Sequence, residues 1–155
     1  PLTVDVIGGP LDTPYAVRLR ELAASDPRIS FRGPVPHEAL GDVLGVVDVL
    51  LVPSRALETG PLVILEALAV GVPVIGTPLG GIAELVEDDR TGKLLPDVGA
   101  AAWSQALAWL AGNPDALARW RGAIGPQRTM LDAARDMVTV YDAVVTRPLA
   151  ARGRA

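Results

Sequence analysis

Short runs rich in β-branched residues alternate with longer stretches that carry apolar residues at helical spacing, and this alternation allows few folds. Strands that alternate with helices predict βαβ units and a parallel sheet covered by helices on both faces. We therefore expect an α/β domain with a doubly wound parallel sheet of about six strands. The expected strands are 2–7, 28–31, 48–52, 73–76 and 93–95, and the expected helices are 15–24, 38–46, 62–70 and 80–86.

The residue pattern changes from residue 100 onward, where no further strand pattern follows and Ala, Trp and Arg recur at helical spacing. Breaks at 112–114 and 125–126 predict three further helices. Residues 148–155 have little to bury, so we expect one domain over residues 1–147 and a loose tail over 148–155. Because a strand pattern begins directly after Pro1, we read the start as an internal cut. We then expect one edge of the sheet to lack its first strand.

The composition excludes several classes of protein. A chain of 155 residues that is 50% hydrophobic suits one folded domain and excludes intrinsic disorder. Pro, Gly, Asp or Glu interrupts every apolar stretch, so no membrane span is expected. With 14 Lys and Arg against 18 Asp and Glu, the chain lacks the clustered cations that nucleic-acid binding needs.

Cysteine is absent, and this excludes disulfides, zinc ribbons, iron–sulfur clusters and thiol catalysis. It also fits a cytoplasmic location. His37 is the only histidine, so a site with several histidine ligands is excluded and we expect no metal site. By position His37 precedes a predicted helix, which is typical of a surface or capping residue.

The loops after the strands are the places to look for a ligand, because open α/β sheets bind ligands beyond the carboxyl ends of their strands. The first such loop is Gly8-Gly9-Pro10. It is not the glycine fingerprint of dinucleotide-binding domains, and Pro10 removes one backbone donor. It is either an ordinary turn or a place where the backbone approaches a ligand.

A second loop leads into an apolar helix. Pro61 suits the first turn of a helix, where its missing N–H costs nothing. The N–H groups of Leu62 and Val63 would then be free, and they form a natural anion site. Glu58 lies just before this helix, where it is either a favourable partner of the helix dipole or a ligand contact.

Glu66 is the only charged or polar residue between Pro61 and Val72. A helix that is apolar all round is expected to be buried, and a buried carboxylate is costly unless it is hydrogen-bonded. Either Glu66 accepts hydrogen bonds from ligand hydroxyls, or it lies on a narrow exposed stripe or pairs with an arginine. A phosphate near the helix start and a diol near Glu66 would suit both features. A nucleotide sugar is such a ligand.

These residues carry a resemblance to a known family. The segments are Pro53-Ser54, Glu58-x7-Glu66-Ala67, Gly71-x-Pro73-Val74-Ile75 and Gly80-Gly81-x2-Glu84-Leu85-Val86. They resemble the donor-binding half of the GT-B retaining glycosyltransferases of glycosyltransferase family 4, over about residues 2–110. The strands at 4–9 and 29–35 also sit where that family has strands. The resemblance implies a Rossmann-like C-terminal domain that binds a nucleotide sugar.

The resemblance also implies roles for particular residues. Glu66 would hold the ribose diol of the nucleotide. The donor sugar would meet Glu58, Thr59, Gly60, Pro61 and Leu62, and the nucleotide would meet Val63, Val35, His37, Gly8 and Gly9, with main chain near Val35 and His37 facing the base. One departure is Thr59-Gly60-Pro61, because the commoner family form has Phe-Gly at positions matching Gly60-Pro61.

The implied activity is transfer of a sugar from a UDP-, GDP- or ADP-linked donor with retention of its anomeric configuration and without a required metal or cofactor. The family's basic diphosphate-binding segment and its N-terminal acceptor-binding domain do not lie within these residues, so we expect this chain alone to be inactive. The alternatives are a GT-B-fold sugar-nucleotide epimerase or hydrolase, and a non-catalytic nucleotide-binding or interaction module. A nicotinamide-dependent dehydrogenase is disfavoured by the missing glycine fingerprint.

Two further expectations concern Glu84 and the tryptophans. Glu84 follows Gly80-Gly81, and we expect it to hydrogen-bond the backbone of that loop. Trp103, Trp109 and Trp120 lie on the predicted C-terminal helices, and we expect them to pack in the core.

Overall fold

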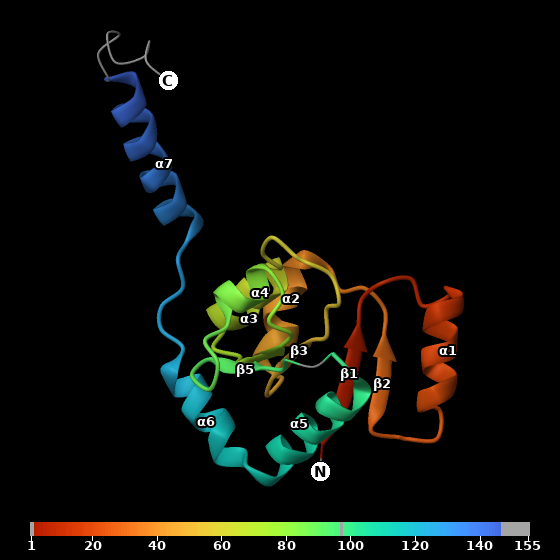
Figure 1. Ribbon diagram of the computed structural model, residues 1–155. Coiled ribbons are helices and arrows are strands. Elements are labelled where there is room, and N and C mark those ends of the chain that lie inside the picture. The colour runs from red at the N-terminus through yellow and green to blue at the C-terminus, as the bar shows by residue number, and fades with distance from the viewer. Residues whose placement is uncertain (1, 97, 147–155) are drawn as a thin grey trace. The chain divides into compact units, whose positions relative to one another are not determined.

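The computed structural model describes residues 2–96 and 98–146 (Figure 1). They fall into two compact units, the first ending at Gly125 and the second beginning at Pro126. All the strands of the described chain lie in the first unit, and the second holds one helix. None of the described helices combines the length and apolar character that crossing a membrane requires.

The first unit follows the alternating order that the sequence predicts. Each strand and helix predicted before residue 100 is present, with ends displaced by at most two residues. The strands are β1 (Val4–Ile7), β2 (Ile29–Arg32), β3 (Leu50–Val52), β4 (Val74–Gly76) and β5 (Gly92–Leu94). The helices are α1 (Pro14–Ala23), α2 (His37–Gly45), α3 (Leu62–Ala69), α4 (Gly81–Leu85), α5 (Ala100–Gly112) and α6 (Pro114–Ala123).

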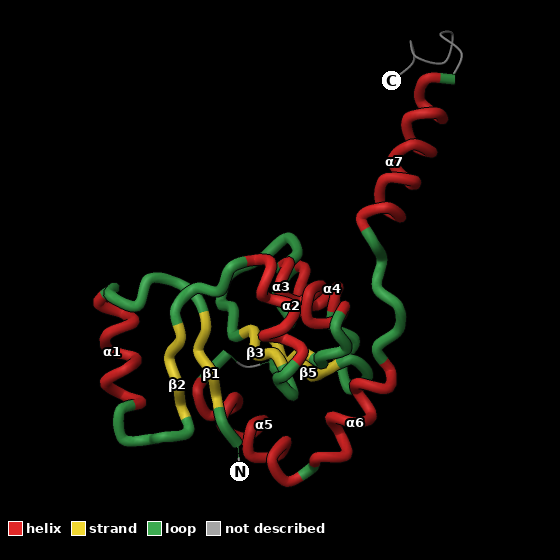
Figure 2. Tube along the Cα trace, turned by 180° about the vertical axis from the view of Figure 1, so that it is seen from behind, coloured by secondary structure: helices red, strands yellow, loops and turns green. Residues whose placement is uncertain are grey.

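The strands pair in parallel, which confirms the doubly wound α/β class. β1 pairs with β2, with Val4 opposite Ile29, and β3, β4 and β5 form a second group in that order. The expectation of one sheet of about six strands is wrong, whereas the expectation that a first strand is missing stays a prediction. The described strands form two sheets, of two and three strands, because β1 pairs only with β2 and β3 pairs only with β4 (Figure 2).

The core is built on both faces of β4, whose three residues are all buried. Successive side chains of a strand point to opposite faces. Val74 therefore packs with Ile64 of α3 and Ile82 of α4, whereas its neighbour Ile75 packs with Trp120 of α6 on the other face. This packing fixes the loops at the carboxyl ends of β3 and β4.

The β1–β2 sheet is less well covered. Val6 is 37% exposed although it lies in the middle of a strand. α1 begins at a cap in which the Thr13 hydroxyl accepts from the Ala16 N–H at 3.2 Å, and none of its residues is buried. This half of the unit lacks the two-sided cover that parallel sheets normally have.

The second unit contains α7 (Met130–Val145), which begins at a reciprocal cap between Thr129 and Asp132. The hydrogen bond from the Thr129 hydroxyl, followed by that from its N–H, lowers the pKa of Asp132. No described residue of α7 is buried. Three helices after residue 100 are confirmed, with breaks where they were predicted. The predicted tail, 148–155, lies outside the described residues.

The three tryptophans differ in how deeply they are buried. Trp120 is 1% exposed and belongs to the core, as expected. Trp103 is partly buried against the same cluster. Trp109 is 45% exposed, so the expectation that it packs in the core is wrong. The centroid of its ring lies 6.1 Å from that of the Trp120 ring, and Trp109 is the more exposed member of this aromatic pair.

Candidate functional site

The loop from Pro53 to Pro61, between β3 and α3, is tied to the next βα unit by hydrogen bonds. The Ser54 hydroxyl donates to the Glu58 carboxylate. The Thr77 hydroxyl, at the end of β4, donates to the Ser54 carbonyl at 2.6 Å. The Gly81 N–H donates to the Glu58 carbonyl, also at 2.6 Å. Glu58 is thus held through both its side chain and its main chain.

Two glycines at the start of α4, the cap residue Gly80 and the first helical residue Gly81, make this close approach possible. A Cβ at Gly80 would lie 2.4 Å from the Glu58 carbonyl oxygen, and Gly80 also has a positive φ of 53°. A Cβ at Gly81 would lie 2.7 Å from the Gly60 nitrogen. Distances this short are forbidden by van der Waals contact. The Gly-Gly pair therefore sets the position of the loop that carries Glu58.

α3 begins with free backbone donors. Its first bond runs from the Ile64 N–H to the Pro61 carbonyl at 3.0 Å, and Pro61 supplies no side-chain cap. Within the described chain, the N–H groups of Leu62 and Val63 meet no acceptor. Unsatisfied N–H groups and the helix dipole together favour an anion at such a position.

Glu66 lies in the second turn of α3 and faces the start of α2. Its Oε1 is 3.5 Å from His37 Nδ1, and the Glu66 side chain is 27% exposed whereas that of His37 is 86% exposed. The expectation that α3 is buried all round is wrong, because Leu62 is 70% and Leu65 is 40% exposed. The charged neighbour of Glu66 is thus His37, the first residue of α2, and not an arginine.

The remaining predicted residues lie in the loops after β1 and β2. Gly8 and Gly9 follow β1 with φ values of 114° and 54°, and a Cβ at either would meet nothing within 4 Å. Val35 is half-buried between β2 and α2. No hydrogen bond or ion pair joins these three to Glu58 or Glu66 in the described chain. They lie beyond strand ends, as predicted.

Sequence reasoning missed how the loop is held. Ser54 and Gly81 stand in the segments that carry the family resemblance, which was the available signal, but no role follows from the spacing alone. Thr77 gave no signal beyond its position after a strand. Glu84 does not hydrogen-bond the loop backbone as expected. It is exposed, and in the described chain the contact to the loop is made by Gly81.

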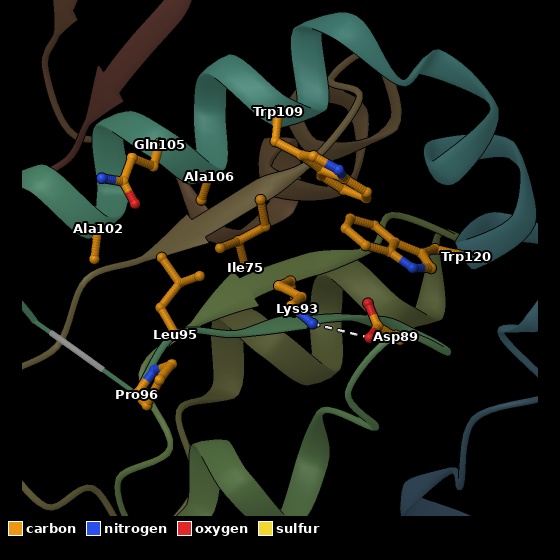
Figure 3. Close-up of a pocket in the computed structure, with 10 residues that line it drawn as sticks. All are labelled: Ile75, Asp89, Lys93, Leu95, Pro96, Ala102, Gln105, Ala106, Trp109 and Trp120. Atoms are coloured by element: carbon orange, nitrogen blue, oxygen red, sulfur yellow. Dashed lines mark hydrogen bonds and ion pairs between the residues drawn. The ribbon is translucent and has the colours of Figure 1, made fainter.

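A separate apolar pocket lies on the other face of β4. It measures about 550 Å³ and opens between α5, α6 and the face of β4 and β5 (Figure 3). Trp109, Trp120 and Ile75 form its apolar wall, and Lys93 at its rim is hydrogen-bonded to Asp89 at 2.9 Å, which is the main reason that the pKa of Lys93 is raised. None of the predicted site residues lines this cavity.

The sequence of this chain is similar to those of known glycosyltransferases. Residues 1–113 match the sequence profile of the family described as Glycosyl transferases group 1. The chain is 39% identical, over 125 residues, to a D-inositol 3-phosphate glycosyltransferase of Nocardia farcinica, a match that covers 76% of this chain and 27% of that protein.

Two solved structures share the fold. A glycosyltransferase from Rickettsia africae superposes with a TM-score of 0.78 at 19% identity, covering 96% of this chain and 41% of that one. Anabaena Alr3699/HepE, solved in complex with UDP-glucose, superposes with a TM-score of 0.69 at 20% identity, covering 92% of this chain and 39% of that one.

The fold and the loop geometry define a Rossmann-like α/β domain of the GT-B type. The chain belongs to the glycosyl transferases group 1 family, as the resemblance of its motifs predicted. It spans only about a quarter to two fifths of the length of the relatives it matches.

Proposed function

We propose that this chain is the donor-binding half of a retaining glycosyltransferase, which transfers a sugar from a nucleotide sugar to an acceptor. The observation that carries the proposal is the start of α3, where the free N–H groups of Leu62 and Val63 lie between Glu58 and Glu66. The names of the relatives and the UDP-glucose bound to one structural neighbour support it.

Each part of the donor has a suitable partner in this arrangement. The Leu62 and Val63 N–H groups suit the diphosphate, and the Glu66 carboxylate, 27% exposed, suits the ribose hydroxyls. Glu58, Thr59 and Gly60 suit the sugar, with Pro61 and the Leu62 main chain beside them. The main chain near Val35 and His37 suits the base, and Gly8 and Gly9 leave the backbone open toward the nucleotide.

His37 adds a feature to this assignment. At 3.5 Å from Glu66 it interacts strongly with the carboxylate only when the imidazole is protonated. Because the His37 side chain is 86% exposed, it can turn aside at little cost when a nucleotide binds.

The chemical step needs more than this chain. Retaining transfer requires stabilisation of the charge that develops on the leaving diphosphate, for which fixed donors such as a helix N-terminus serve without a metal. We propose that the longer protein also contains an acceptor-binding domain, and that a separate basic segment before Leu2 supplies the cations that bind the diphosphate. A cytoplasmic location, which the absence of cysteine favours, stays a prediction.

The direct test is to measure the Tm of the purified chain with and without each nucleotide, because a ligand that binds the folded state raises Tm. We expect stabilisation by one of UDP, GDP or ADP and by its sugar conjugates, with UDP tested first. A ligand at about 100 times its Kd stabilises a protein by about 2.7 kcal/mol, which raises Tm by several degrees in a domain of this size. We expect no sugar transfer by this chain alone. Failure of every nucleotide to bind would favour a non-catalytic module, and release of free sugar or an epimer by the longer protein without acceptor would favour the hydrolase or epimerase.

Gly81→Ala tests the loop that presents Glu58. The new methyl group would collide with the Gly60 nitrogen at 2.7 Å, so residues 58–60 must move. We expect affinity for the sugar conjugate to fall by roughly tenfold, about 1.4 kcal/mol, while the fold persists because Thr59 and Gly60 are exposed. Calorimetric titration measures the loss. Gly122→Ala is the matched control, because a Cβ there meets nothing within 4 Å, and equal affinities of the two variants would contradict the prediction.

A further inference from the structure

The pocket between α5, α6 and the face of β4 and β5 contains none of the residues assigned to the donor. It lies wholly within the first unit (Figure 3). Its volume of about 550 Å³ is within the range of small-molecule sites. Apart from Asp89, Lys93 and Gln105, the residues that line it are apolar. Such a pocket, apolar with a few polar groups, has the composition of a ligand site.

Trp109 gives this pocket an aromatic surface. Its ring plane is tilted by 33° from that of Trp120, so one aromatic contact of Trp109 is made within the chain. Trp109 is nevertheless 45% exposed, and the rest of its ring can pack against another molecule. Offset or edge-to-face packing of two aromatic rings contributes to binding beyond the burial of apolar area. The pocket therefore favours an occupant that contains an aromatic ring.

The indole N–H of Trp120 has no acceptor. Trp120 lines the pocket and is 1% exposed, and its Nε1 is buried without a hydrogen-bond partner in the described chain. Buried N–H groups are nearly always hydrogen-bonded, and that of a buried tryptophan usually finds an acceptor. In Figure 3 the nitrogen lies on the edge of the ring that faces Asp89, whose carboxylate is bonded to Lys93. An occupant that carries an acceptor at this end of the pocket would satisfy the N–H.

The charged groups at the rim of the pocket neutralise one another. Lys93 is the only cation among the described residues that line it, and its Nζ lies 2.9 Å from Asp89 and 3.4 Å from Asp88. An anionic occupant would therefore meet two carboxylates and one ammonium group that is already paired. It would also have to bring its charge out of water and against an apolar wall, which is costly. The rim thus favours an uncharged occupant.

We propose that this pocket binds an uncharged aromatic molecule that carries a hydrogen-bond acceptor. The ring of this molecule packs against Trp109, and its acceptor receives the Trp120 N–H. Its remaining apolar surface covers Ile75 and Ala106, which line the pocket between α5 and β4 (Figure 3). This site holds or fails independently of the proposed donor site, because the two have no residue in common.

An NMR titration of the chain with 2-acetylnaphthalene, an uncharged aromatic ketone, tests the proposal. We expect the indole N–H signals of Trp109 and Trp120 to shift, with the Trp120 proton moving to higher frequency as its hydrogen bond forms. Trp103 does not line the pocket, so its indole signal is the internal control. The anion 2-naphthoate has nearly the same size, and we expect it to bind at least about tenfold more weakly. Unchanged Trp109 or Trp120 signals would overturn the proposal, as would equal affinities for the two probes.

A matched pair of variants shows whether the probe occupies this pocket. Ala106→Leu fills the pocket from α5, whereas Ala108→Leu makes the same change at an exposed position of that helix. We expect affinity for 2-acetylnaphthalene to fall by at least about tenfold in the first variant and to stay the same in the second. Equal affinities would show that the probe binds elsewhere and would overturn the proposal. If Ala106→Leu does not fold, Ala102→Leu, which fills the pocket one turn earlier on α5, is expected to give the same loss.

Discussion

Replacing Glu66 with alanine is expected to weaken binding of a nucleoside diphosphate by roughly ten- to a hundredfold. Hydrogen bonds to a charged acceptor contribute about 1.5–3 kcal/mol, and each 1.4 kcal/mol is about a factor of ten in affinity. Glu66 is the only polar side chain of α3, so no neighbour on the helix can replace it. Isothermal titration calorimetry with the diphosphate and with its sugar conjugate measures the effect.

Glu58→Ala is the informative partner of that variant. Glu58 lies before the helix, bonded to Ser54, and we assign it to the sugar. Its replacement should barely change affinity for the bare diphosphate but should abolish any preference for the sugar conjugate. Glu21→Ala, which removes an exposed carboxylate from α1, controls for the change in net charge. Equal losses on the bare diphosphate for Glu58→Ala and Glu66→Ala would refute the assignment, as would unchanged binding by Glu66→Ala.

Gly92→Ala is expected to have the largest effect on stability. A Cβ at Gly92 would lie 1.8 Å from the Val74 carbonyl oxygen, which belongs to the rigid backbone of β4. β5 would have to move away from β4, and the pairing of Val74 with Gly92 would be lost. We expect the free energy of unfolding to fall by about 3 kcal/mol or more, a large fraction of a typical domain's stability. Urea unfolding followed by circular dichroism measures it.

Gly45→Ala is the matched control for that variant. Gly45 is the last residue of α2, and a Cβ there would meet nothing within 4 Å. Because alanine favours helix over glycine by up to about 1 kcal/mol, stability should stay the same or rise slightly. A Gly92→Ala protein as stable as the Gly45→Ala protein would show that β5 can leave β4 without cost.

Local sequence signals were enough to predict the elements of this fold. Pro and Gly residues interrupt regular structure at Gly33-Pro34, Pro53 and Gly71. The strands β2 and β3 and the helix α3 end within two residues of these positions. The order of elements then restricts the sheet to parallel pairing. Glu66 could be singled out because a lone carboxylate in an apolar stretch is visible without any knowledge of tertiary contacts, and Glu58 because it lies just before the predicted start of that helix.

Tertiary structure alone decided which distant residues meet. The division into two sheets depends on which strand edges find partners, and a strand pattern is the same whether its edge is paired or open. The contacts of Glu66 with His37, and of the Glu58 loop with Thr77 and Gly81, join segments that follow different strands. Such contacts are set by the positions of whole elements in the sheet, which no spacing of residues along the chain encodes.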